Sequence, residues 1–438
     1  MSQPAASSAP RKFGVREAAF IGIGSMVGAG IFSLLGAAGA VAGAAVWLSF
    51  LMAGAVALLQ GYSFAKFGAR YPSAGGLLEY VIRGYGNGHF AGVIAWLILA
   101  TNAIVTGMVA VSFGSYASSA VSAESKGAIA AFAVLLIVAM TLLNILGSNA
   151  VARVQTVVVI VVIGILTVFS VATLSNLKPH LLAFSGYPAL QHIVSSVALT
   201  FFAFLGFGVV TFTAKELANP RKQLPRAMFL ALGTATVIYV AVSIGVFGTL
   251  TVKEVIDSGG TALAVAAQPV LGRAGYWLMT VTALFATSGA TNAGLFPARG
   301  LCEEMTAIGQ FPPVMGRRLG DRAPTGLLVT AGVAIILAAG FNLDSIASLG
   351  SAIALIVFVL ITIGHVRVRA ETGAQLWLLL LAIVTAGGVF VTFVFTTLVH
   401  EPATAVTMGV ILLLGVVADF GWKRRRSVQP AAIHFGYR

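Results

Sequence analysis

The amino-acid sequence predicts an all-α polytopic membrane protein with about twelve transmembrane helices. Hydrophobic residues make up 58% of the 438 positions and charged residues only 9%, whereas a soluble domain is about 45–50% apolar and about 25% charged. In addition, apolar stretches of about 20 residues, the length that crosses a bilayer, recur along nearly the whole chain. Most of the chain is therefore expected to lie in lipid.

The apolar stretches between charged or turn-forming clusters give the predicted spans. They fall at residues 16–37, 41–66, 89–121, 127–147, 151–176, 191–214, 226–250, 271–300, 324–342, 345–366, 375–398 and 402–421. An even number of spans places both termini on the same side of the membrane. Residues 1–10 are polar, and no small-residue cleavage site follows the first apolar stretch. No signal peptide is therefore expected.

The net charge of +13 is explained by topology. If the N-terminus is cytoplasmic, every Lys and Arg lies on the cytoplasmic side except Lys126, Lys178, Lys253 and Arg273. This asymmetry is the one that the positive-inside rule expects. We therefore expect a multi-pass protein of the cell inner membrane with both termini cytoplasmic. Its basic residues are expected to contact anionic lipid headgroups rather than nucleic acid.

Several classes of function lack the residues that they require. Cys302 is the single cysteine, so no intramolecular disulfide can form, and no Cys/His cluster has the spacing of a metal site. The spans contain no paired carboxylates or nucleophile with its base, as an intramembrane enzyme would need, and no ring of charges typical of an ion channel. The sequence thus favours a transporter without a bound cofactor or metal.

The first predicted span is interrupted by glycine. Gly22, Gly24, Gly28 and Gly30 fall at mid-membrane depth, and each glycine costs about 1 kcal/mol relative to alanine inside a helix. Unwound backbone at this depth is tolerated only where it is buried in protein or lines a cavity. Helix packing through Gly24-x-x-x-Gly28 is the alternative explanation. A dinucleotide-binding loop is excluded because no strand precedes the glycines.

The sixth span carries a shorter interruption, Gly206 and Gly208 within a phenylalanine-rich segment. Breaks in the first and sixth spans occupy corresponding places in two sets of five helices, which indicates an inverted repeat with its binding site at the breaks. Half-helix N-termini suit a carboxylate and the facing carbonyls suit an ammonium group. Such a pair could hold an amino acid without any charged side chain. The predicted divisions are a tail at 1–12, repeats at 13–176 and 191–370, two added helices at 375–422 and a basic tail at 423–438.

Five ordered motifs carry a resemblance to the amino acid–polyamine–organocation (APC) transporter superfamily. The first-helix pattern is matched by Gly-Ser-Met-Val-Gly-Ala-Gly-Ile-Phe at 24–32, and the proline and paired-glycine loop by 71–76. The Asn-x-x-Gly turn is similar to 144–147. The phenylalanine-rich run at 201–207 and Glu-x-x-Asn-Pro-x-x-x-x-Pro at 216–225 together resemble the sixth-helix signature. After the eighth span, Arg299 and then Phe-Pro at 311–312 and Ala-Pro at 323–324 are similar to the family's spacing.

This resemblance implies a five-plus-five inverted repeat with two added helices, working by alternating access. It places the substrate at the first and sixth breaks, against the third, eighth and tenth helices. The substrate carboxylate would lie on the backbone amides of Val27, Gly28, Ala29 and Gly30. The amine would face carbonyls near Ile23, Phe202 and Leu205. Phe202 would be an aromatic gate with Phe207 beside it, and Asn102 would be the polar contact from the third helix.

The sequence departs from the family pattern where an ion or a cationic substrate would be held. Gly208 stands where many relatives have an acidic residue, Val162 stands where proton-coupled relatives have a lysine, and Lys215-Glu216 replaces an acidic pair. A coupling ion could be a proton or sodium. Sodium would need oxygen ligands, for which carbonyls of the first helix and the hydroxyls of Thr287, Ser288 and Thr291 are candidates. We therefore expect a permease or exchanger of small or neutral amino acids. Polyamines or other organic amines are the alternative substrates, and an ion channel or ion transporter is a further alternative.

Overall fold

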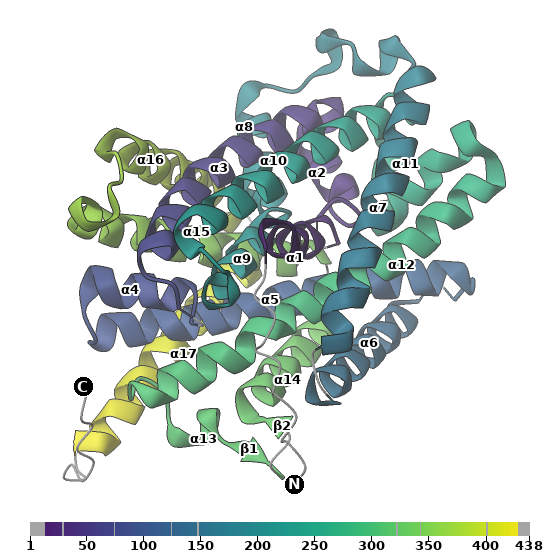
Figure 1. Cartoon of the computed structure of the whole chain (residues 1–438). Helices are drawn as coiled ribbons and strands as arrows, with labels where there is room; N and C mark the ends of the chain where they lie inside the picture. Colours follow the sequence, from purple (N-terminus) through teal and green to yellow (C-terminus); the bar gives the residue numbers. More distant parts are fainter. Residues whose placement is uncertain are drawn as a thin grey trace, which may run out of the picture.

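The computed structural model describes residues 14–427 except 29, 74, 124, 147–148, 321–322, 342 and 400–401. The described chain is a bundle of helices with one short pair of strands (Figure 1). This confirms the predicted all-α polytopic class, because the described residues are mainly helical and several of their helices are long and apolar enough to cross a membrane. The strands β1 (Arg318–Leu319) and β2 (Ala323–Pro324) pair antiparallel next to the loop at residue 320.

The first half of the chain contains α1 (Val15–Val27), α2 (Leu35–Ala42), η1 (Gly43–Ala45), α3 (Val46–Arg70), α4 (Leu77–Tyr85), α5 (His89–Ala120), α6 (Lys126–Leu146), α7 (Asn149–Ser175), η2 (Pro179–Leu182) and η3 (Phe184–Gly186). The middle contains α8 (Leu190–Phe202), η4 (Leu205–Gly208), α9 (Val209–Phe212), η5 (Ala214–Glu216), α10 (Pro220–Phe247), α11 (Val252–Asp257) and η6 (Gly259–Thr261). The remainder contains α12 (Ala262–Ala307), α13 (Pro313–Gly316), α14 (Thr325–Gly340), α15 (Leu343–Thr372), α16 (Leu376–Phe393), the π-helical η7 (Val394–Leu398) and α17 (Pro402–Ser427).

Within the described residues, eight helices are long and apolar enough to cross a membrane, or nine when the bent pair α8 and η4–α9 counts as one span. The other three predicted stretches are helical too. One is divided by the break after α1, a second lies within the 46-residue α12, and the third forms the 16-residue α14. Helix α12 is itself kinked at Gly272, whose φ of 69° is not helical. The count of twelve spans, like the inverted repeat and its boundaries, stays a prediction.

The structure contains both predicted helix interruptions. Helix α1 ends at Val27, and regular helix resumes only at Leu35. The sixth span leaves the α-helix after Phe202, passes through the 3₁₀ turn η4 and bends by 43°. Because each break replaces intrahelical hydrogen bonds, its backbone must be enclosed by neighbouring helices.

Helix α1 lies at the centre of the bundle (Figure 1) and packs against α7, α10 and α12. Close approach between the surrounding helices depends on small residues. A Cβ atom added to Gly61 of α3 would lie 2.5 Å from Cδ1 of Leu232 in α10, and one added to Gly54 would lie 2.6 Å from Thr236. Glycines of this kind let membrane helices approach each other closely.

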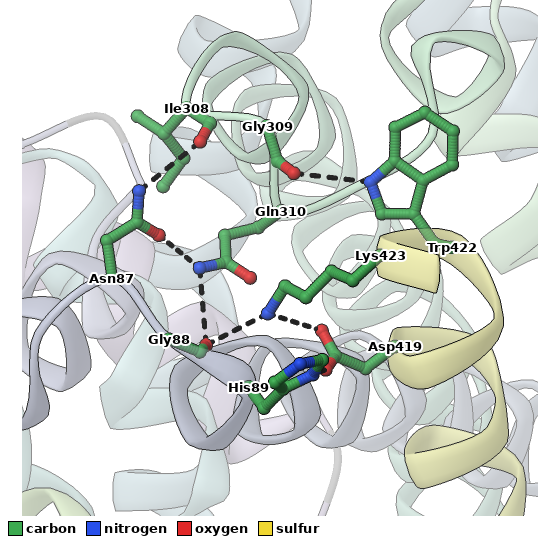
Figure 2. A network of polar contacts seen from close by, with 9 residues as sticks. All are labelled: Asn87, Gly88, His89, Ile308, Gly309, Gln310, Asp419, Trp422 and Lys423. Carbon is green, nitrogen blue, oxygen red and sulfur yellow. Dashed lines mark hydrogen bonds and ion pairs between the residues drawn. The ribbon is translucent and has the colours of Figure 1, made fainter. Parts of the chain in front are cut away.

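A buried carboxylate joins α17 to the start of α5 (Figure 2). Asp419 is fully buried, with Oδ2 2.6 Å from Nδ1 of His89 and Oδ1 2.8 Å from Nζ of Lys423. Lys423 also donates a hydrogen bond to the carbonyl of Gly88 at 2.9 Å. Phe420 stacks on the His89 ring with centroids 4.3 Å apart.

The segment after α12 joins these contacts between α5 and α17, and together they form a polar junction (Figure 2). Trp422 Nε1 donates to the carbonyl of Gly309 at 3.2 Å, and Gln310 Nε2 donates to the carbonyl of Gly88 at 3.3 Å. Asn87 Nδ2 donates to the carbonyl of Ile308 at 3.3 Å. The ends of α5, α12 and α17 are thereby tied together on the side that the sequence predicts to be cytoplasmic.

Candidate functional site

A cavity of about 30 Å³ lies between the broken sixth span and α5. Its lining residues are Ser25 of α1, Leu77 of α4, Ile98, Thr101, Asn102 and Val105 of α5, Leu205, Gly206 and Gly208 of η4, Val209 and Phe212 of α9, Gly294 of α12, and Val357 and Phe358 of α15. A water molecule needs about 10–15 Å³ of such space. The cavity therefore has room for water in this conformation, and its walls must separate before an amino acid can enter.

The two broken spans meet through glycine. A Cβ atom added to Gly206 would lie 2.5 Å from the carbonyl carbon of Ser25 and 2.6 Å from the amide nitrogen of Met26. One added to Gly30 would lie 2.0 Å from Cβ of Ala203. These distances are too short for any side chain, so the backbones of the two breaks are in direct contact. The glycines are required by this contact.

The first break also lies directly against α12. A Cβ atom added to Gly28 would lie 2.1 Å from the carbonyl oxygen of Ala286 and 2.6 Å from Cβ of Ala290. The φ of Gly28 is −71°, which any residue can adopt. Glycine is therefore needed here for space and not for backbone conformation.

Asn102 supplies an unsatisfied polar group to the cavity. Its Nδ2 atom is buried and has no hydrogen-bond partner among the described residues. By contrast, the buried amide of Gln60 donates to the carbonyl of Ala382 and accepts from Thr362. An unpaired buried donor is costly, so the amide of Asn102 is available to a bound polar ligand. Thr101 and Ser25 add hydroxyl groups to the same wall.

The cavity contains no ionisable side chain among the lining residues of the described chain. Most of its wall is apolar, from Leu77, Ile98, Val105, Leu205, Val209, Phe212, Val357 and Phe358. Charges on a ligand would therefore have to be met by backbone groups and by the few uncharged polar side chains. A charged ligand side chain would lose its water against this wall and find no opposite charge, whereas an uncharged side chain needs none.

The predicted carboxylate-binding backbone is hydrogen-bonded within the protein. The amide of Gly28 donates to the carbonyl of Gly24 at 3.4 Å, and that of Gly30 donates to the carbonyl of Met26 at 3.2 Å. Val27 and Gly28 border a separate, smaller gap. Ala29 lies outside the described residues. These amides become available to a ligand only if the break rearranges.

The predicted aromatic residues lie behind the cavity wall. The Phe202 ring is fully buried, and a Cβ atom added to Gly350 of α15 would lie 2.5 Å from its Cε2 atom. The Phe207 ring packs on Phe358, with centroids 5.3 Å apart. Ile23 is buried in the core. Of the predicted binding residues, the structure thus brings Asn102 and Leu205 to the cavity itself.

The candidate cation ligands donate back to their own helix. The hydroxyls of Thr287, Ser288 and Thr291 donate to the carbonyls of Ala283, Leu284 and Thr287 at 2.6, 2.7 and 2.8 Å. This is the usual bonding of hydroxyls in membrane helices. The adjoining gap, about 10 Å³, is lined only by apolar residues and glycines: Gly24, Val27, Gly28, Val158, Val159, Val162, Ile163 and Ala286.

Several cavity residues were not predicted from the sequence. Ser25 belongs to the first-helix motif, and Thr101 adjoins Asn102, so both could have been inferred from their neighbours. Phe212 and Phe358 carry no such signal. The chain contains 28 phenylalanines, most within apolar stretches, and only packing distinguishes the ones that face the cavity.

The family model for amino acid permeases matches residues 13–418. The chain is 31% identical over 420 residues to the inner membrane transport protein YbaT of Escherichia coli (strain K12), covering 95% of this chain and 98% of that one. It is 26% identical to the branched-chain amino acid permease BcaP of Bacillus subtilis (strain 168), covering 83% and 82%. A shorter match, 27% over 168 residues, is to the mouse Asc-type amino acid transporter 1, covering 37% and 31%. The chain belongs to the amino acid permease family of the APC superfamily and is a multi-pass membrane protein.

Proposed function

We propose that this permease exchanges small, neutral amino acids across the membrane by alternating access, with the cavity between the broken sixth span and α5 as its binding site. One observation carries the proposal. The cavity has no charged side chain among its described lining residues, yet it contains the buried, unpaired amide of Asn102. The protein would move its substrate without chemical change and so would not be an enzyme.

The proposed site matches the groups of an amino acid. The carboxylate and ammonium groups would be held by backbone amides and carbonyls that the two breaks release when the site opens. The Asn102 amide would donate a further hydrogen bond. The substrate side chain would lie against the apolar wall. The names of the relatives BcaP and Asc-type amino acid transporter 1 support amino acids as the substrate class.

Exchange is proposed because the gap beside the first break offers no cation site. Its described lining residues, Val162 among them, are apolar or glycine, and the nearby α12 hydroxyls bond to their own helix. A sodium ion there would lose water without gaining a side-chain ligand, and no described lining residue has a side chain that could carry a proton. The absence of a counter-charge in the cavity equally disfavours a dicationic polyamine as substrate.

The experiment is counterflow in proteoliposomes. Uptake of radiolabelled alanine is measured into vesicles preloaded with unlabelled alanine or with buffer, without a sodium or pH gradient. Exchange requires faster uptake into the preloaded vesicles. Uptake into buffer-loaded vesicles that a sodium or pH gradient accelerates would instead establish symport. Uptake of putrescine but not of any neutral amino acid would establish an amine carrier.

We further propose that both termini are cytoplasmic. The distribution of Lys and Arg supports this orientation. The polar junction of Asn87, Gln310 and Lys423 is consistent with it, because it joins ends that the topology assigns to one side. A C-terminal reporter that is active only in the cytoplasm tests it. A reporter that is active only in the periplasm would reverse the topology.

A further inference from the structure

We propose that Phe358 sets the upper limit on the size of the amino-acid side chain that the cavity accepts. The proposal rests on the proposed function, because it takes the cavity as the substrate site. Phe358 lines the cavity from α15 and is 3% exposed. A rigid aromatic wall limits ligand size only if its ring cannot turn aside, so the contacts behind the ring determine its effect.

Three rings hold Phe358 from behind. Its centroid lies 5.0 Å from that of Phe64 in α3, 5.3 Å from that of Phe207 in η4, and 6.2 Å from that of Phe201 in α8. Phe64 and Phe207 are also in contact, 5.5 Å apart. These are the separations of favourable aromatic pairs. Because the supporting rings come from three other elements, Phe358 cannot swing away from the cavity without displacing the core.

The glycines of the cavity supply a second, independent observation. A Cβ atom would lie 2.5 Å from backbone at Gly206 and 2.6 Å from Thr106 Oγ1 at Gly294, so packing excludes a side chain at both. At Gly208 the nearest atom, Leu77 Cδ1, would be 3.4 Å away. A methyl group fits there, and the φ of −57° permits it. The missing side chain at Gly208 therefore adds space to the cavity that packing does not require.

Together these features define a side-chain subsite that Phe358 bounds on one side, even when the other walls separate to admit the substrate. The free space at Gly208 admits a small substrate side chain, and the supported ring of Phe358 excludes a large one. Substrates with side chains the size of alanine or serine are expected to be exchanged faster than leucine or phenylalanine. The selectivity would therefore be set by volume, because the described wall offers no charge to discriminate between side chains.

The experiment compares the ratio of leucine to alanine exchange in wild type, Phe358→Leu and Phe204→Leu. Phe204 is a fully buried ring of the broken sixth span that packs on Tyr239 and does not line the cavity, so Phe204→Leu is the matched control. Shortening Phe358 should raise the ratio about tenfold, the lower range for one methylene group in an apolar pocket. Phe204→Leu should leave it unchanged. Equal ratios in wild type and Phe358→Leu, or equal increases in the two variants, would overturn the proposal.

A second variant, which narrows the cavity instead of widening it, keeps the proposal testable if Phe358→Leu does not fold. Gly208→Ala narrows the cavity without a clash and should lower the ratio. If Phe358→Leu does not exchange, stabilisation of each purified protein by leucine and by alanine, measured by thermal shift, gives the same comparison for binding. An unchanged ratio in Gly208→Ala together with unchanged preference in that assay would contradict the proposal. Absence of both binding and exchange of every amino acid in wild type would instead refute the proposed function.

Discussion

Gly206 of η4 lies directly on the backbone of Ser25 in α1, so close that a Cβ atom would stand 2.5 Å from the Ser25 carbonyl carbon. Two residues later, Gly208 has free space on its Cβ side. The same short turn thus contains one glycine that holds the two breaks together and one that does not. Packing therefore requires glycine at 206 and does not require it at 208.

Gly206→Ala is expected to destabilise the protein by about 1–3 kcal/mol, the usual cost of forcing an extra methyl group into a packed core. Gly208→Ala should leave the melting temperature unchanged or raise it, because alanine restricts the unfolded chain at a compatible backbone conformation. Thermal unfolding of the purified variants provides the measurement. Equal melting temperatures for the two variants would show that the backbones of the breaks are not in contact as described.

Asn102→Leu is expected to weaken alanine binding without lowering stability. The Nδ2 atom of Asn102 has no partner among the described residues, so the substitution removes no protein hydrogen bond. Asn144→Leu is the matched control, since Asn144 Nδ2 donates to Asn292 Oδ1 at 2.7 Å and to the Met140 carbonyl at 2.8 Å. Leaving the Asn292 oxygen unpaired should cost about 1–3 kcal/mol.

These two variants are compared by thermal shift with and without alanine. A melting temperature that falls in Asn102→Leu as far as in Asn144→Leu would assign Asn102 a structural role. Unchanged alanine affinity in Asn102→Leu would remove it from the proposed binding site.

Asp419→Asn is expected to lower the free energy of unfolding by about 1–3 kcal/mol. Breaking a fully buried pair typically costs about 3–5 kcal/mol, and the smaller value follows because His89 and Lys423 retain contact with solvent. Glu303→Gln is the control. Glu303 is 41% exposed and pairs with Arg299 and Arg318 at 3.1 and 3.6 Å, and exposed pairs contribute about 0–1 kcal/mol. An equal loss of stability in both variants would mean that burial of Asp419 does not strengthen the junction.

Phe202→Ala tests the predicted gate. If the ring closes the site, its removal should let preloaded alanine leave into buffer without external alanine, because the occluded state would no longer exclude water. Phe204→Ala provides the comparison, since Phe204 is a buried ring of the same segment that packs on Tyr239 with centroids 5.0 Å apart. Efflux that increases equally in both variants would make Phe202 part of the core and not a gate.

The fold class was predictable because a chain in lipid must be apolar where it spans and must keep its backbone hydrogen-bonded. Both conditions produce patterns that can be recognised within a short stretch of sequence. The breaks were also predictable from local sequence, because glycines such as Gly28 and Gly206 disfavour a continuous helix. Asn102 was predicted only through the resemblance to the APC superfamily, which implies a polar contact from the third helix.

Tertiary structure alone decided which side chains surround the cavity. Phe358 is one of 28 phenylalanines, and its position in the wall depends on the rotation of α15 and on rings contributed by α3, α8 and η4. The same holds for Gly206 and Gly208, which are alike in sequence and differ only in what faces them. The sequence by itself thus determined the all-α polytopic class, the breaks and the charge asymmetry, because these follow from local interactions of the chain with lipid and water. The shape of the candidate site depends on contacts between distant segments, which no local pattern records.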